Sequence, residues 1–165
     1  YVLVYTPLKR RTPLSTVVGA VPGALPIVGG WTAAGGTLGP EAAVLFAILF
    51  LWQMPHFLAL SWMYRADYAR AGFRVLSVDD PDGAMTFRQM ALHAIAVLPV
   101  ALAPSLLGMT GKIYFAGALA ASLLFAWAGI HAARTRSAAG ARLLFIVSLV
   151  HLPTLLALLV LDGVT

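Results

Sequence analysis

The sequence predicts an all-α protein: a polytopic bundle of five transmembrane helices. Of its 165 residues, 61% are hydrophobic and only 10% are charged, whereas a soluble domain carries about 25% charged residues. The charged residues are grouped, so that five long runs contain none. These runs are continuously apolar rather than alternating, which favours helices over the strands of a membrane barrel. This composition excludes a soluble enzyme, a disordered tail and a nucleic-acid-binding module.

The five charge-free runs give the helices in order. About 20 apolar residues are needed to cross the hydrocarbon core of a bilayer, and a helix satisfies all its backbone groups internally. We therefore expect spans near residues 16–37, 42–64, 89–108, 113–133 and 143–161. The first is rich in Gly and Pro (VVGAVPGALPIVGGW), which predicts a kinked and tightly packed helix. A break that lines a substrate site is the alternative.

The basic residues predict the orientation of these spans. Because successive spans cross the membrane in opposite directions, every second connecting segment lies on the same side of it. Ten of the eleven Lys and Arg residues fall in three such segments on one side, and only Lys112 falls on the other side. The three segments contain Lys9, Arg10 and Arg11; Arg65, Arg70, Arg74 and Arg88; and Arg134, Arg136 and Arg142. Cytoplasmic loops carry such an excess, so we expect these segments in the cytoplasm and Asp162 outside.

The N-terminal residues indicate how the chain relates to a whole domain. The sequence begins with Tyr1 rather than Met, and YVLVY is typical of the end of an apolar helix that reaches a basic loop. We therefore expect residues 1–165 to be the C-terminal portion of a single, longer transmembrane domain. Cysteine is absent, which excludes disulfides, thiolate metal sites and a cysteine nucleophile.

The segment 65–88 contains the highest density of charge, with eight of the 17 charged residues. Loops longer than about 12–15 residues are usually functional or disordered. We expect its first part, YRADYARAG, to continue the preceding helix and to break at Gly72. In the later VDDPDG, three carboxylates could chelate a divalent ion or simply form a solvated turn; they are Asp79, Asp80 and Asp82.

A polar stripe is expected on the second span. Residues 11 apart return to nearly the same helical face, so His56, Leu60, Met63 and Asp67 would form one line, with Gln53 close beside it. Ionisable groups inside a membrane usually face a protein interior or a wet cavity. The stripe would lead from a buried Gln and His to a carboxylate at the cytoplasmic mouth. A purely structural hydrogen bond of the histidine is the alternative, and it is favoured for the isolated His93 and His151.

The basic cluster Lys9–Arg11 has two interpretations. It is a topology signal, or it binds a diphosphate, because Arg offers a planar fork and Lys a point charge to phosphate oxygens. With Arg65 and Asp67 on the same side, a polyanion could be held together with Mg²⁺, which prefers carboxylates and substrate phosphates. From the residues alone, this is a membrane protein with a polar mouth, and a transporter fits equally well.

Specific motifs resemble a known family. They are YTPLKRRTP, then GAVPGALPIVGGW, then WQMPHFLALSWMYRADYARAGFRVLSV followed by a Pro-Asp-Gly loop. They resemble the protohaem IX farnesyltransferase (haem O synthase) family of UbiA-type intramembrane prenyltransferases. The similarity runs from Tyr5 to about Gln89 in motifs and to the C-terminus in helix pattern. Its most specific part is WQMPHF followed by DYARAG, in which Asp67 comes eleven residues after His56.

The resemblance implies a nine-helix bundle in the bacterial inner membrane, of which this chain would supply helices five to nine. It implies transfer of a farnesyl group from farnesyl diphosphate to a vinyl group of haem B, with addition of water, to give haem O and diphosphate. Mg²⁺ is the implied cofactor, and haem A synthase and terminal oxidase assembly are the implied partners. A prenyltransferase with another acceptor, such as a quinone or chlorophyll precursor, is the nearest alternative.

The resemblance also assigns roles to residues. It implies a catalytic pair, Asp67 and His56, with Asp67 holding the metal, and a substrate-binding set of Lys9, Arg10, Arg65, Gln53 and Trp52. The basic members would lie near the diphosphate, and His56 with Gln53 near the haem. Ala66 replaces a common acidic residue, and the first aspartate-rich motif of the superfamily is not in this sequence. We therefore expect this portion to be inactive by itself.

Overall fold

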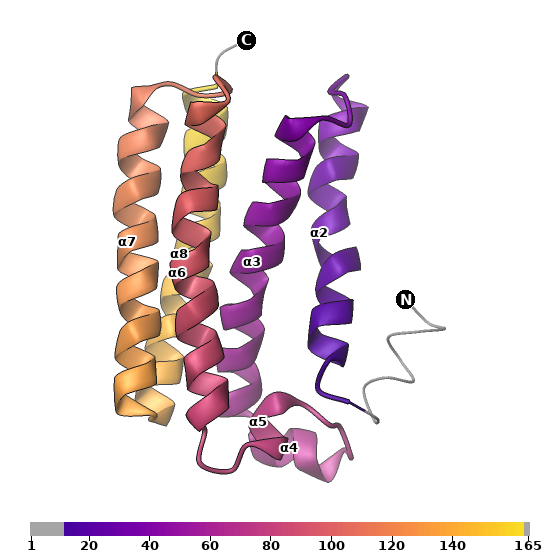
Figure 1. The fold of residues 1–165 in the computed structure, drawn as a ribbon, viewed down its shortest axis with the longest axis vertical. Helices are drawn as coiled ribbons and strands as arrows, with labels where there is room; N and C mark the ends of the chain where they lie inside the picture. The colour runs from indigo at the N-terminus through magenta and orange to yellow at the C-terminus, as the bar shows by residue number, and fades with distance from the viewer. Residues whose placement is uncertain (1–11, 164–165) are drawn as a thin grey trace.

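The protein is a bundle of five long helices and two short ones over residues 12–163, which this computed structural model describes (Figure 1). The long helices are α2 (Ser15–Ala33), α3 (Pro40–Met63), α6 (Ala84–Leu106), α7 (Lys112–Thr135) and α8 (Ala138–Leu161). The short ones are α4 (Arg65–Arg70) and α5 (Leu76–Asp79). All five long helices have the length and hydropathy of membrane spans, which confirms a multi-pass membrane protein.

The helix ends differ from the predicted spans in a systematic way. Helices α6 and α8 each begin five residues earlier than expected, so that Arg88 and Arg142 lie within their first two turns. A long basic side chain near a helix end can reach the interface while its stem stays in apolar surroundings. Charge-free runs therefore mark the hydrocarbon core and not the whole helix. Helix α2 ends at Ala33, before a turn at Gly35 with a φ of +90°.

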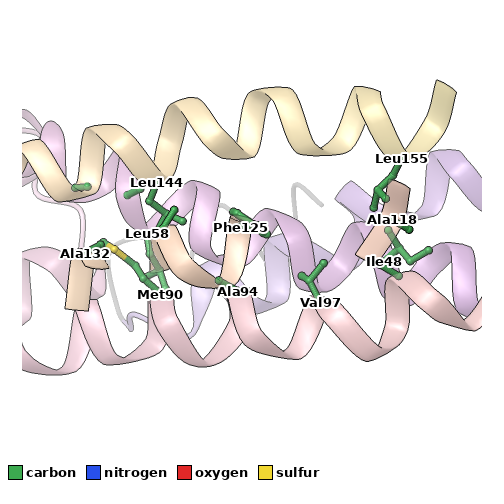
Figure 2. Close-up of a cluster of buried hydrophobic side chains, with 14 of the residues drawn as sticks. Ile48, Leu58, Met90, Ala94, Val97, Ala118, Phe125, Ala132, Leu144 and Leu155 are labelled. Atoms are coloured by element: carbon green, nitrogen blue, oxygen red, sulfur yellow. The ribbon is translucent and has the colours of Figure 1, made fainter. Parts of the chain in front are cut away.

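The core lies among α3, α6, α7 and α8, which pack in a ring in that order, with α8 closing against α3. Helix α2 stands outside the ring and packs on α3 (Figure 1). Many of the core positions are alanine, as at Ala94, Ala118 and Ala132 (Figure 2). A β-carbon at Gly129 would lie 2.7 Å from the Cβ of Ala94. Small residues thus let α6 and α7 approach closely, as is typical of helix packing in membranes.

The short helices α4 and α5 lie across one end of the bundle, which we call the α4–α5 end (Figure 1). The expectation that α3 continues through YRADYARAG is wrong. Helix α3 stops at Met63, and Tyr64 leaves the helical region with φ −109° and ψ 22°. The N–H of Asp67 then bonds the carbonyl of Tyr64 at 2.9 Å, which starts α4 in a new direction. The expected break at Gly72 is confirmed, with a φ of +69°.

Candidate functional site

A cavity of about 480 Å³ lies between α2 and α3 and reaches the α4–α5 end. Helix α2 contributes small and hydroxylated residues to its wall, and α3 contributes an amide, a hydroxyl and two large apolar side chains. The segment after α3 supplies two aromatic rings and a valine. The lining residues are Ser15, Thr16, Gly19, Pro22, Gly23, Gln53, Phe57, Leu60, Ser61, Tyr68, Phe73 and Val75. The space therefore combines an apolar wall with a few hydrogen-bonding groups.

Gln53 is the buried polar group of this cavity. Its side chain is 4% exposed, and its Nε2 donates a hydrogen bond to the carbonyl of Ala20 on α2 at 2.7 Å. Two prolines inside α2, Pro22 and Pro26, lack an N–H, and the carbonyls that they leave without a helical donor are those of Val18 and Pro22, not that of Ala20. The glycine at Gly23 lets α3 pack closely against α2.

Trp52 and His56 turn away from this cavity toward α8. The indole Nε1 of Trp52 donates to the carbonyl of Ser148 at 2.9 Å, and Nδ1 of His56 lies 2.8 Å from the Ser148 hydroxyl. The imidazole ring stacks with the rings of Trp52 and Phe145, at centroid distances of 4.9 and 4.7 Å. The structure therefore gives Gln53 and His56 different neighbours on different sides of α3.

The polar stripe expected along α3 is wrong for two reasons. Leu60 lines the α2–α3 cavity with Gln53, whereas His56 contacts α8. Asp67 belongs to α4, so the break at Tyr64 removes it from the helical register of His56.

Asp67 and Arg65 occupy different surroundings at the α4–α5 end. Asp67 is exposed and forms an ion pair with Arg70. Arg65 lies over the ring of Trp62, 4.5 Å from its centroid, and its Nη1 donates to the carbonyl of Pro81 at 3.4 Å. Arg65 thus lies on the α5 side of α4, while Tyr68 lines the cavity. Lys9 and Arg10 lie outside the described residues.

The three carboxylates of VDDPDG have separate local partners. Asp79 pairs with Arg74 at 3.0 Å, and Asp80 accepts from the N–H and the hydroxyl of Thr86 at 2.6 and 2.7 Å. Burial tends to raise the pKa of the Asp80 carboxyl, but the hydrogen bonds from Thr86 outweigh it, and the pKa lies below its ordinary value. Between residues 12 and 163, no three His, Asp or Glu side chains are grouped to hold a metal ion.

Two contributors to these sites have no signal in the sequence. Ser148 and Phe145 lie about 90 residues from His56 along the chain, in a helix that is apolar on all sides. A serine in such a helix is usually a packing residue. The sequence does contain a signal for Tyr68 as a cavity residue, because Tyr68 follows Asp67 directly in the charged segment that is expected to form the mouth.

Comparison with known proteins adds to this geometry. The UbiA prenyltransferase family matches residues 1–152. The chain is 51% identical over 162 residues to the protoheme IX farnesyltransferase of Solibacter usitatus, which covers 98% of this chain and 56% of the relative. The proteins of the same name from Koribacter versatilis and Salinibacter ruber are 44% and 46% identical, each over 98% of this chain and over 54% and 57% of their own lengths.

The chain therefore spans about half the length of the curated relatives it matches. No solved structure matches it.

Proposed function

The chain belongs to the UbiA prenyltransferase family, and from this premise we propose that the protein it forms part of is a haem-modifying prenyltransferase. The proposed reaction transfers a farnesyl group from farnesyl diphosphate to a vinyl group of haem B, with addition of water, and gives haem O and diphosphate. The protein would lie in a bacterial inner membrane with its α4–α5 end in the cytoplasm. Haem O would then pass to haem A synthase and to terminal oxidase assembly.

One observation carries this proposal from the geometry. The α2–α3 cavity has a largely apolar wall and reaches the α4–α5 end, where the basic residues gather. Of these, Arg65, Arg70 and Arg74 lie in the segment after α3, which also supplies part of the cavity wall. A prenyl diphosphate likewise has an apolar part and a charged part: its isoprenoid tail is apolar, and its head is a polyanion that arginine binds well. The cavity therefore fits the donor substrate with its tail inward and its diphosphate at the mouth.

The proposed reaction replaces the bond to diphosphate with a bond to haem B. The bond between C1 of the farnesyl group and the diphosphate oxygen breaks, and C1 forms a carbon–carbon bond with the terminal vinyl carbon of haem B. The hydroxyl of a water molecule adds to the inner vinyl carbon, and the remaining proton of that water is released. An apolar cavity protects the developing allylic cation from early capture by water. Basic groups at the mouth stabilise the departing diphosphate electrostatically.

Magnesium fits the described residues in part. It is usually bound by one or two carboxylates together with substrate phosphates and water. Asp67 offers one exposed carboxylate, and its neighbour in the sequence, Tyr68, lines the cavity; the described residues bring no group of three acidic or histidine ligands together. Asp67 would thus supply one ligand from this chain. When bound, the ion supplies charge neutralisation for the leaving diphosphate.

The acceptor side of the proposal rests on the α3–α8 contact. Trp52 and Phe145 each stack with His56, and aromatic side chains of this kind present flat apolar surfaces that suit a planar macrocycle. We place haem B beside this group, with His56 as the polar contact. The separate positions of Gln53 and His56 then correspond to two substrates rather than to one.

The test uses the complete protein in membrane vesicles, supplied with haem B and farnesyl diphosphate. We expect a product whose mass equals that of haem B plus one farnesyl group and one hydroxyl group, formed at a rate that depends on Mg²⁺. Transfer to a quinone or chlorophyll precursor but not to haem B would contradict the proposed acceptor. Solute flux without any prenyl transfer would contradict the enzyme class.

A further inference from the structure

We propose that Ser148 is a positioning residue that holds His56 in the tautomer protonated at Nδ1, so that the lone pair of Nε2 is free for the reaction. The tautomer follows from contacts within this chain. What the lone pair does rests on the proposed function, because it would meet the haem or the water that adds to it. No role for Ser148 follows from the sequence motifs.

The Ser148 hydroxyl has two neighbours but only one proton to donate. Its Oγ lies 2.5 Å from the carbonyl oxygen of Phe145, to which only a hydroxyl proton can be donated. A serine hydroxyl has one proton and two acceptor lone pairs. The contact of 2.8 Å between Oγ and Nδ1 of His56 must then be donated by the imidazole. A neutral imidazole has one N–H, so its Nε2 carries a lone pair.

The orientation of the imidazole ring is set by two aromatic neighbours. Trp52 and Phe145 both stack with the imidazole, at interplanar angles of 20° and 24°. The same Ser148 accepts the indole N–H of Trp52 through its backbone carbonyl. One residue of α8, which is completely buried, therefore fixes both the proton position of His56 and the side chain against which its ring stacks.

The Nε2 atom of His56 is the ring nitrogen left for a ligand. Among residues 12–163, Nε2 of His56 has no hydrogen-bond partner, and it is not among the buried atoms without one. His151 provides the contrast: its Nε2 contacts the Ser122 hydroxyl at 3.1 Å, and its unpartnered Nδ1 is fully enclosed. A polar atom within a membrane span normally faces protein or a wet cavity. The accessible Nε2 of His56 is therefore placed to meet a ligand, and the enclosed Nδ1 of His151 is not.

Either role proposed for His56 requires the lone pair on its Nε2. An axial bond to haem iron uses a nitrogen lone pair, and so does acceptance of the proton released when water adds to the vinyl group. In metal sites, a hydrogen bond at the second ring nitrogen sets which tautomer is present, and its loss costs about 10–100-fold in affinity or activity. Ser148 would have this orienting role for either reaction.

The tautomer can be measured directly by ¹⁵N NMR of the complete protein labelled at histidine nitrogens, with His56→Gln used to assign the signals. We expect His56 to show a protonated Nδ1 and an unprotonated Nε2. Ser148→Ala should move the ring toward the other tautomer, and Ser148→Thr, which keeps the hydroxyl, should restore it. Ser122→Ala is the matched control, because it removes a buried serine from His151 and leaves His56 unchanged. A wild-type ring protonated at Nε2 would overturn the proposal without any variant.

The activity of the same variants tests what the lone pair does. We expect Ser148→Ala to lower kcat about 10–100-fold while KM for farnesyl diphosphate stays constant, with recovery in Ser148→Thr. A shifted Soret band of bound haem B in Ser148→Ala would indicate iron ligation, and an unshifted band with the same loss of kcat would indicate proton transfer. An unchanged kcat despite an altered tautomer would overturn the role of Ser148 in catalysis. Absence of haem O formation in the wild type, with the expected tautomer, would instead overturn the proposed function.

Discussion

Gln53 fills the space that a side chain at Gly23 would occupy. A β-carbon on Gly23 would lie 2.5 Å from Oε1 of Gln53, closer than two such atoms can approach. The Nε2 of the same Gln53 amide donates to the carbonyl of Ala20, which also lies on α2. The contact between α2 and α3 beside the cavity therefore depends on a glycine and a glutamine that the sequence separates by 30 residues.

Replacement of this glycine tests the contact. We expect Gly23→Ala to displace the Gln53 amide from Ala20 and to lower the free energy of unfolding by about 1–3 kcal/mol, as overpacking does. Gly29→Ala is the matched control, because Gly29 lies in the same helix with no atom within 4 Å of its β-carbon. It should leave stability unchanged or raise it by about 0.5–1 kcal/mol. Thermal unfolding in detergent measures both, and equal Tm values for the two variants would contradict the steric account.

Asp67 should matter for activity and little for stability. Its ion pair with Arg70 is exposed, and such pairs contribute about 0–1 kcal/mol. If Asp67 holds Mg²⁺ at the diphosphate, Asp67→Asn in the complete protein lowers kcat about 100-fold or more, the order expected for a lost electrostatic contact to a developing charge. The Tm should stay within the error of the wild type.

Asp79→Asn is the control for Asp67. Asp79 forms a similar ion pair, with Arg74, in the same segment, so its loss should leave haem O formation unchanged. Equal activity of both variants and the wild type would remove Asp67 from the metal site.

Arg65 has two separable roles in these proposals. Its guanidinium stacks on Trp62, a cation–π contact worth about 0.5–1 kcal/mol at an exposed site. The proposed second role of the guanidinium is to bind the diphosphate as a cation. Arg65→Lys keeps the charge and loses the planar stack, so we expect a lower Tm with a nearly normal KM for farnesyl diphosphate. Arg65→Gln should lower the Tm and raise KM.

The control for charge alone is Arg88→Gln, which removes a cation at the same end of the bundle but from α6. It should change neither value. If Arg65→Gln leaves KM unaltered, Arg65 only braces the segment between α4 and α5.

Asp80 should make stability depend on pH in a defined direction. Its folded pKa lies below the ordinary value, so the ionised form stabilises the fold above the ordinary pKa of about 3.9. This stabilisation is lost as the pH falls through the lowered folded pKa. Asp80→Ala should cost about 0.5–2 kcal/mol at neutral pH, as loss of a helix cap does.

The measurement is a series of Tm values from neutral pH to below pH of about 3.9. The Tm difference between wild type and Asp80→Ala should shrink toward the acidic end. A difference that is constant over the series would show that the carboxylate charge of Asp80 does not stabilise the start of α6. Asp82→Ala, which removes only a contact of 3.4 Å to the N–H of Ala84, should have a smaller effect.

The sequence by itself determined the number of spans, their approximate limits and the family. These follow from properties that are local along the chain: charge-free length, basic loops, the glycine at Gly72 and motifs such as WQMPHF. It did not determine the break at Tyr64, because YRADYARAG is a good helical sequence and nothing in it marks the residue at which α4 turns away.

Only the tertiary structure decided which neighbour each polar side chain meets. Trp52, Gln53 and His56 lie within five residues of α3, yet Gln53 contacts α2 and the other two contact α8. An amphipathic helix shows its buried face through its hydrophobic pattern. Helix α3 is apolar on all sides, so its hydrophobic pattern does not predict which face of the helix points to which neighbour. That rotation is set by packing against α2, α6 and α8, and it is what brings Ser148 to His56.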